Sequence, residues 1–542
     1  MFVRLGDCFF AQQRWDAAIA LYHLGRSQTT DSASIDARLT TARMKLSPPS
    51  RTEPSSSSPV LQYFETTLDW VQTTNLPNVD YCPVSWEKMT AQTSECMTSS
   101  CSTPPFSAPP SSKSLSSEPL SSEPPSSELP SSQSAVCGGV TCSTCMTNLC
   151  DRFKPHQLYP NILQCNSPEA LNTREAIAIA PLPTFVVTIP DGRVWNEPQQ
   201  NTWAICNSIG VMTPDHALLG DLSRYYPWFL PNCRHSHHHN HPVMDGHDSL
   251  NQDSLHSNAQ LLDGRVVVLS GLSGHIYYHW IFDVLPRLGI LQQAGWSWEQ
   301  VDAFVVNSLS RPFQRETLAL LGVPESKVLE SDRYPHLQAT ELIVPSFPGH
   351  FDWVPSGTIE FLRSAFLPPA AQLQPPHPQR SWPRYLYISR SQATYRRIFN
   401  EDELIAQLQP LGFTVLHLET LSVLEQVAFF SYAEIIVTPH GAGLTNSVFC
   451  QSGSHIIEIV SPNYVRTDYW IVSYQVGLSH YVVTGDTVEC AMLRQIMYQS
   501  PLTEDIWLSA ATLAAMIDLL NRLIPSARLS QSSPQPSARA ER

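Results

Sequence analysis

The segment at residues 438–446, TPHGAGLTN, carries the strongest chemical signal in this sequence. It follows the apolar run at residues 435–437, which predicts a strand, and a helix is expected to begin at its end. Gly441 and Gly443 lack side chains, so the backbone here can approach a ligand closely. The amide groups and the N-terminus of the following helix can then bind an anion such as a diphosphate.

Other polar residues should lie beside this segment, because they lie on the neighbouring strands or follow their carboxyl ends, where open α/β sheets bind ligands. They are Ser389, Arg390, Arg396 and Glu458. Arginine suits a phosphate because its guanidinium offers planar, paired donors. A carboxylate suits a ribose because it accepts hydrogen bonds from both hydroxyls. One arginine alone would be interpreted as a surface charge, but their convergence at strand ends predicts a nucleoside diphosphate site.

A second chemical group lies earlier in the chain, at His275, His279 and Asp283. Their spacing of four places them on one stripe of a helix, provided that the helix extends back to His275. Either residue type could accept a proton from an attacking hydroxyl, and we rank Asp283 first and His279 close behind. Zinc binding and a structural role for His279 are the alternatives. The zinc alternative is weak because the glutamate expected between the histidines of a metallopeptidase helix is absent.

The elements that position these residues alternate between strand and helix from residue 265 onward. Strands are expected at 265–269, 303–306, 341–344, 385–388, 414–418, 434–437 and 455–460, and helices at 277–294, 314–321, 401–409 and 423–431. This alternation predicts parallel sheets covered on both faces. A stretch rich in Pro and Gln at residues 368–383 divides them into two units, so we expect two Rossmann-like domains facing a cleft.

Two helix starts in the second unit have the pattern of a capping box. In the first, Asn400 precedes the helix and Glu403 follows three residues later. In the second, Ser422 and Glu425 have the same spacing. Both helices are therefore predicted to begin directly after these polar residues.

The ordered set of motifs resembles glycosyltransferase family 61, also known as DUF563. The N-terminal signature is HIYYHWIFDVLPR at residues 275–287. The C-terminal motifs are Ile388-Ser-Arg390, Arg396, Asn400-Glu401, Gly412-Phe413, Glu425-Gln426, HGAGLTN at residues 440–446, and Glu458. The match extends over roughly residues 275–481, and its specificity comes from the motifs in combination.

This resemblance implies an α/β fold of the GT-B type and inverting transfer of a sugar from a nucleotide sugar. The donor is commonly UDP-linked, and the acceptor is a hydroxyl of a glycan or protein. No further cofactor and no metal are expected. The nucleotide-sugar-binding residues would be Ser389, Arg390, Arg396, His440, Gly441, Ala442, Gly443, Asn446 and Glu458, with Glu458 on the ribose. The catalytic candidates would be Asp283, His279 and His275.

The chain is expected to divide into five regions. These are a tetratricopeptide-like helical hairpin at residues 1–46, a disordered Ser/Pro-rich linker at 47–136, an acceptor-side domain at 137–374, a nucleotide-sugar domain at 375–526, and a disordered tail at 527–542. A plain helical hairpin is the alternative for the first region, which could also bind a protein partner. Within the third, Cys137, Cys142, Cys145 and Cys150 form either a zinc site or unpaired thiols, and the His-rich stretch at 235–256 reads as a loop.

Composition narrows the function further. A formal net charge of −15 over 542 residues argues against a nucleic-acid binder. No signal peptide and no apolar run of membrane-spanning length is recognised, and the 13 cysteines are scattered, so we expect a cytoplasmic protein, free or peripheral at a membrane. A non-catalytic scaffold with a degenerate transferase domain is the main alternative. A nicotinamide oxidoreductase is disfavoured because the Gly-x-Gly-x-x-Gly fingerprint is absent.

Overall fold

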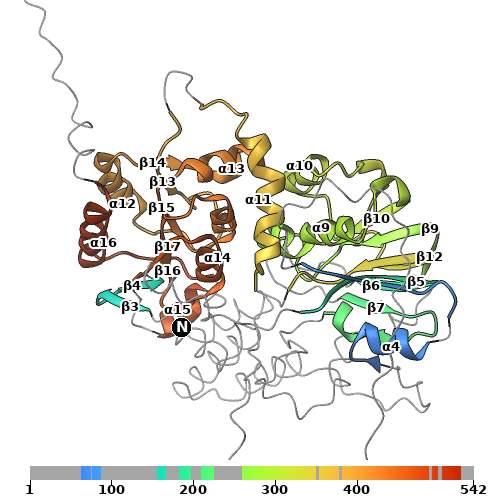
Figure 1. The fold of residues 1–542 in the computed structure, drawn as a ribbon. Coiled ribbons are helices and arrows are strands. Elements are labelled where there is room, and N and C mark those ends of the chain that lie inside the picture. Colours follow the sequence, from blue (N-terminus) through green and yellow to red (C-terminus); the bar gives the residue numbers. More distant parts are fainter. Residues whose placement is uncertain are drawn as a thin grey trace, which may run out of the picture.

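The computed structural model describes residues 63–74, 76–86, 155–166, 182–196, 209–224, 259–349, 353–376, 381–486, 491–498 and 503–525. In this part of the chain, two β-sheets with helices packed on them form two lobes (Figure 1). Several predictions lie outside the described residues. They are the helical hairpin at 1–46, the cysteine cluster at 137–150, the His-rich loop at 235–256 and the tail at 527–542.

The first sheet, sheet A, has the strand order β1-β8-β7-β6-β12-β9-β10-β11, with β5 beside β12 and β2 beside β5. Its strands are β1 (Tyr63–Phe64), β2 (Asp80–Val84), β5 (Thr184–Pro190), β6 (Arg193–Asn196), β7 (Ile209–Met212), β8 (Leu218–Leu219), β9 (Gln260–Val268), β10 (Ala303–Val306), β11 (Val328–Glu330) and β12 (His336–Pro345). The predicted parallel arrangement holds for β12, β9, β10 and β11. β2, β5, β6 and β7 precede the region for which strands were predicted, and they pair antiparallel and widen the sheet.

The second sheet, sheet B, has the order β14-β13-β15-β16-β17-β4-β3. Its strands are β3 (His156–Tyr159), β4 (Ile162–Asn166), β13 (Tyr385–Ile388), β14 (Thr414–Leu416), β15 (Ile435–Pro439), β16 (His455–Val460) and β17 (Ser479–Thr484). The strands from β14 to β17 are parallel, as predicted, and their side chains are buried on both faces from β13 to β17.

Helices cover both sheets. They are α4 (Thr67–Thr73), α8 (Tyr277–His279), α9 (Pro286–Gln293), α10 (Pro312–Leu320), α11 (Ser356–Ala370), α12 (Glu401–Leu408), α13 (Val423–Tyr432), α14 (Asp468–Val476), α15 (Ala491–Met497) and α16 (Ala510–Leu523). α11 runs between the two lobes and contacts α9 on one side and α13 on the other (Figure 1). A single buried apolar cluster joins the lobes there, with Leu288, Leu362 and Phe430 among its members.

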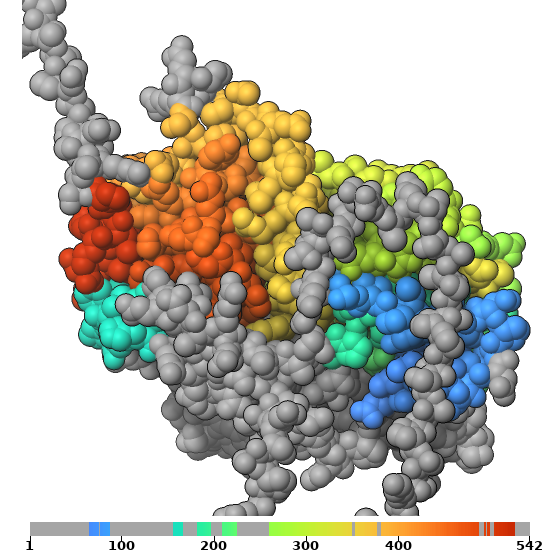
Figure 2. Space-filling view, viewed as in Figure 1, coloured from blue at the N-terminus to red at the C-terminus, as the bar shows by residue number. Residues whose placement is uncertain are grey.

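Two segments lie where the sequence did not place them. The region expected as a linker contributes β1, α4 and β2 to sheet A, because Trp70 buries its ring and the Asp221 carboxylate accepts hydrogen bonds from Thr67 at the start of α4. β3 and β4 fall within residues 137–374, the range expected for the acceptor-side domain. β4 nevertheless pairs antiparallel with β17 in sheet B. Figure 2 shows this pair on the surface beside α16, where the Tyr159 hydroxyl bonds Asp518.

Candidate functional site

Sheet B brings the predicted binding residues to one edge. β13, β15 and β16 are adjacent and parallel, so their carboxyl ends lie together. Ser389 and Arg390 directly follow β13, His440 directly follows β15, and Ser461 directly follows β16. Ser389 is buried and donates its hydroxyl to the Ser391 hydroxyl at 3.0 Å, so it shapes the turn after β13.

Arg390 packs directly against Gly441. A Cβ placed on Gly441 would lie 2.1 Å from the Arg390 Nη1 atom, and the backbone of Gly441 is otherwise extended, with φ 173°. A larger residue at this position would therefore force the Arg390 guanidinium to move. The Arg390 guanidinium also donates to the carbonyls of Tyr395 at 3.1 Å and Arg396 at 3.3 Å, which fixes its plane.

Gly443 has a similar explanation. A Cβ at this position would lie 2.7 Å from the Leu418 Cδ1 atom. Protein side chains therefore lie directly beside both glycines, and the close approach of their backbone to a ligand stays a prediction. The half-buried residues Ala442 and Gly443 begin a 3₁₀ helix, η9 (Ala442–Phe449), whose N-terminus lies at the same edge.

Arg396 lies beside Arg390 in an unusual conformation. Its φ of 53° is in the left-handed region, and its guanidinium lies 4.8 Å from the Tyr395 ring centroid and 5.2 Å from that of Tyr464. Neither arginine has an ion-pair partner among the carboxylates of the described residues. Burial and, after it, the neighbouring Arg396 charge lower the pKa of Arg390 to about 10. Two adjacent guanidinium groups without a carboxylate create a positive site suited to an anion.

His440 is held by a chain of buried hydrogen bonds. Its Nδ1 lies 2.5 Å from the Glu458 Oε1 atom, and the other carboxylate oxygen lies 2.9 Å from His480 Nε2. His480 Nδ1 lies 2.8 Å from the Ser473 hydroxyl. Because an ionised carboxylate only accepts, both histidines donate to Glu458, and His440 Nε2 is left with a lone pair.

Glu458 therefore has a different position from the one predicted. Its side chain is 0% exposed, and both oxygens bond histidines, so it does not face a ribose. Burial raises the pKa of this carboxyl, but the hydrogen bonds from His440 and His480 outweigh burial and lower the pKa to about 2. Burial also lowers the pKa of His440, against the opposing effect of Glu458, so this imidazole is neutral at pH 7. Glu458 positions His440.

Asn446 also differs from the prediction. Its Oδ1 atom accepts from the Tyr277 hydroxyl at 2.8 Å, and its Nδ2 donates to Gln426 at 2.9 Å. The residue is completely buried, so its amide does not reach a ligand. It connects the signature at residues 275–287 to the loop after β15, and thereby fixes one lobe against the other.

His279 and Asp283 form a buried pair on the other side of the site. His279 Nδ1 lies 2.7 Å from Asp283 Oδ2, and both residues are 4% exposed. Asp283 Oδ1 faces Arg224 Nη1 at 3.7 Å. The pair spans a π-helical turn, η4 (Trp280–Val284), of a kind frequent at functional sites. With Nδ1 donating to the carboxylate, the lone pair of the imidazole lies on Nε2.

His275 is separate from this pair. The helix begins at Tyr277, after Ile276 in an extended conformation, so the stripe of three residues expected from the spacing is not formed. Burial lowers the pKa of His275 to about 4. His275 is therefore neutral at pH 7.

Aromatic rings link the two halves of the site. The Tyr278 ring contacts His279 at 5.0 Å and Tyr469 at 5.7 Å between centroids, and Tyr469 in turn lies 5.4 Å from His440. Tyr464 and Tyr469 do not belong to any motif that the sequence analysis recognised. The same is true of His480 and Ser473, which complete the hydrogen-bond chain from His440. His480 and Ser473 could not have been found, because only the pairing of β17 with β16 brings them to Glu458.

The Gly441→Ala variant tests the packing at this edge. The new methyl group would meet the Arg390 guanidinium, whose plane two carbonyls fix, so the arginine must move away from the edge. We expect weaker binding of UDP in calorimetry with a near-normal fold. Gly271→Ala is the matched control, because its Cβ would meet no atom closer than 3.6 Å. Equal UDP affinity in the two variants would contradict this role of Gly441.

Comparison with known families supports an assignment for the domain that carries this site. Residues 277–457 match the family model described as Glycosyltransferase 61. The match supports a glycosyltransferase 61 domain in this chain, as the motifs predicted, and it includes His279, Asp283, Arg390, Arg396 and His440. It does not extend to the predicted tetratricopeptide-like segment. No curated protein matches the chain.

Two further observations concern the described part of the chain alone. None of its helices combines the length and the apolar character needed to cross a membrane. Within the same residues, His, Cys, Asp and Glu side chains do not gather into a group that could hold a metal ion.

Proposed function

We propose that this chain is an inverting glycosyltransferase that uses a nucleoside diphosphate sugar, with UDP as the nucleotide, and transfers the sugar to a hydroxyl of a glycan or protein. Sheet A and sheet B would act as the acceptor-side and donor-side domains of a GT-B arrangement. The support comes from the glycosyltransferase 61 match together with the arginines at the edge of sheet B.

One observation carries the proposal most directly. Arg390 and Arg396 lie side by side at the carboxyl edge of parallel strands, and neither forms an ion pair with a carboxylate of the described residues. A diphosphate that bound there would gain two charge-assisted hydrogen-bonding partners. The neutral His440, whose Nε2 carries a lone pair, could accept a proton and then donate to the same anion.

The proposed step is a single displacement. The acceptor oxygen forms a bond to C1 of the sugar while the bond between C1 and the diphosphate oxygen breaks. The acceptor proton passes to His279 Nε2, and the Asp283 carboxylate stabilises the imidazolium that results. The diphosphate leaves with the electron pair, and Arg390 and Arg396 stabilise its developing charge. Asp283 would then be a positioning residue and His279 the base, which reverses their predicted ranking.

Arg396→Ala tests the donor half of the proposal. Loss of one charge-assisted contact to phosphate should weaken UDP binding by about 10- to 100-fold, since such bonds contribute ~1.5–3 kcal/mol. Arg390→Ala should have at least the same effect. Calorimetry with UDP and GDP, alone and as sugar conjugates, measures both affinities and identifies the nucleotide. Affinity for UDP should fall as salt is raised.

Arg333→Ala is the matched control, because its side chain is 73% exposed and pairs with Glu330 away from this edge. The proposal fails at the donor site if both arginine variants bind UDP as tightly as this control. If neither the unaltered protein nor any variant binds or turns over a nucleotide sugar, the scaffold alternative is favoured.

A further inference from the structure

A pocket lies at the opposite edge of sheet B from the site described above. It has a volume of about 640 Å³, within the range of ~300–1,000 Å³ that small-molecule sites occupy. Its wall is formed where β13, β15 and β16 begin, with the end of α13 and the end of α16 beside them. Neither the family match nor the proposed transfer reaction assigns a role to this pocket.

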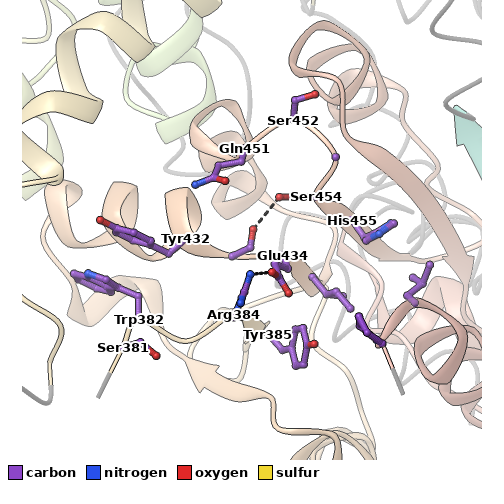
Figure 3. A pocket seen from close by; sticks show the side chains of 15 residues that line it. Ser381, Trp382, Arg384, Tyr385, Tyr432, Glu434, Gln451, Ser452, Ser454 and His455 are labelled. Atoms are coloured by element: carbon purple, nitrogen blue, oxygen red, sulfur yellow. Dashed lines mark hydrogen bonds and ion pairs between the residues drawn. The ribbon is translucent and has the colours of Figure 1, made fainter. Parts of the chain in front are cut away.

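The polar groups of the pocket are planar and, taken together, uncharged. The Arg384 guanidinium pairs with the Glu434 carboxylate in the middle of the wall, and His455 lies on one side of them (Figure 3). Burial lowers the pKa of His455, so this imidazole is neutral at pH 7. Because the single positive charge is paired with a negative one, the pocket is poorly suited to a phosphate, in contrast to the edge that carries Arg390.

Two polar atoms in the wall lack hydrogen bonds. The Tyr385 hydroxyl and His455 Nδ1 are buried and have no partner among the described residues. Groups of this kind cost free energy until they gain a partner. The exposed Gln451 and Ser452 side chains add further donors and acceptors at the rim.

An aromatic surface completes the pocket. Trp382 and Tyr432 stack with their centroids 5.6 Å apart and their planes within 3°, on the opposite side of the ion pair from His455 (Figure 3). Phe429 supports Trp382 edge-on at 5.0 Å, so the tryptophan is fixed and only 8% exposed. Tyr432 is 42% exposed and presents its ring to the outside.

We propose that this pocket binds a neutral saccharide, as a second carbohydrate site separate from the site of transfer. The C–H groups on one face of a sugar ring carry partial positive charge and pack against the electron-rich face of an aromatic ring, here Tyr432. The hydroxyl groups of the same sugar both donate and accept, as the guanidinium, carboxylate, imidazole and amide of this wall require. A charged ligand would find no free opposite charge here, because Arg384 and Glu434 already neutralise each other.

The two sites are too far apart for one sugar unit to reach both. β15 joins them, since Glu434 precedes its first residue and His440 follows its last. These two residues are therefore separated by about 20 Å at ~3.3 Å per residue. A longer chain could occupy both, so the pocket would hold a distal part of the acceptor or product. That link to transfer rests on the proposed function, whereas saccharide binding by the pocket does not.

Saturation-transfer NMR on the full chain tests the proposal, with xylobiose, chitobiose, mannobiose and lactose as probes. At least one probe should bind, and Tyr432→Ala should weaken its affinity in calorimetry by about tenfold or more, as expected for loss of an aromatic contact. Tyr432→Phe should keep the affinity, because the ring remains. Phe399→Ala is the matched control, since this ring is 76% exposed elsewhere on sheet B's lobe.

UDP calorimetry on the same samples separates this proposal from the proposed function. Tyr432→Ala should bind UDP normally; if it loses UDP, the pocket is part of the nucleotide site and the proposal is overturned. It is also overturned if no probe binds at millimolar concentration, or if the bound probe tolerates Tyr432→Ala. Should that variant melt early, Glu434→Gln, which removes the charge but not the shape, replaces it.

Discussion

Replacing His279 with alanine should lower kcat by about 100- to 10,000-fold, the contribution typical of general base catalysis, and leave UDP affinity unchanged. The reason lies in the hydrogen bond of 2.7 Å from His279 Nδ1 to Asp283, which leaves Nε2 as the atom able to accept a proton. The edge that carries the arginines belongs to the other sheet, so donor binding should not depend on this imidazole. Release of UDP during transfer and UDP calorimetry measure the two quantities separately.

Asp283→Asn should lower kcat by a similar factor, but for a different physical reason. The amide keeps the shape of the carboxylate but cannot stabilise the imidazolium, and its N–H groups allow the other tautomer of His279. Release of UDP during transfer should therefore slow at saturating substrate, with UDP affinity and thermal stability near those of the unaltered protein. A purely structural role would instead lower the thermal stability together with kcat.

His275→Ala provides the comparison, because this histidine precedes the helix that begins at Tyr277 and lies outside the hydrogen bond between His279 and Asp283. We expect its effect on kcat to be much smaller than that of His279→Ala. Normal turnover in the His279 variant, or an equal loss in both histidine variants, would remove His279 from the role of base.

The sequence predicted local elements well wherever a short segment determines its own structure. The strands expected at residues 303–306, 385–388 and 455–460 have those bounds in the structure. Their runs of apolar and β-branched residues are typical of buried parallel strands. The capping box at Ser422 and Glu425 is likewise confirmed, because its partners are three residues apart.

Predictions failed where the partner of a side chain lies far away in the sequence. α12 begins directly after Asn400, as predicted, and the Asn400 amide donates to Glu403 at 2.9 Å. The expected cap hydrogen bond is not made, because the same amide bonds the backbone of Leu508, 108 residues away. Asn446 meets Tyr277 from the other lobe. In each case the sequence identified a residue with a specific contact, but only the packing of distant elements determines which contact it makes.

The same reasoning explains the site. The arginines and the loop after β15 could be assigned to one edge because parallel strands place their carboxyl ends together. Whether a carboxylate at this edge can bind a ligand depends on whether buried side chains of the protein already occupy its oxygens. Glu458 does not face a ligand, because His480 on β17 bonds its carboxylate. The sequence spacing of these two residues predicts no contact, since only the pairing of β16 with β17 brings them together.

Removing the Glu458 side chain should therefore destabilise the protein strongly. In Glu458→Ala, two buried imidazoles lose their shared acceptor, and each buried donor left without a partner costs about 1–3 kcal/mol. Glu458→Gln should cost less, because an amide can accept from one histidine and donate to the other. This variant should fold, bind UDP more weakly through a reoriented His440, and keep the sugar site at Tyr432 intact.

The pH dependence of stability gives the sharpest check. The pKa of Glu458 is about 2 in the folded protein and 4.5 without the fold, so its contribution is present above about pH 4.5 and lost as the pH falls towards 2. The difference corresponds to roughly 3 kcal/mol. Burial lowers the pKa of His440 from 6.5, so acid costs stability at this residue too, beginning below about pH 6.5. Denaturant titrations between pH 7 and pH 3 should show a steep loss in the unaltered protein and a shallower one in Glu458→Gln. Parallel curves would mean that the carboxylate beneath His440 is not ionised, and His440 would then lack the fixed tautomer on which its role at the diphosphate depends.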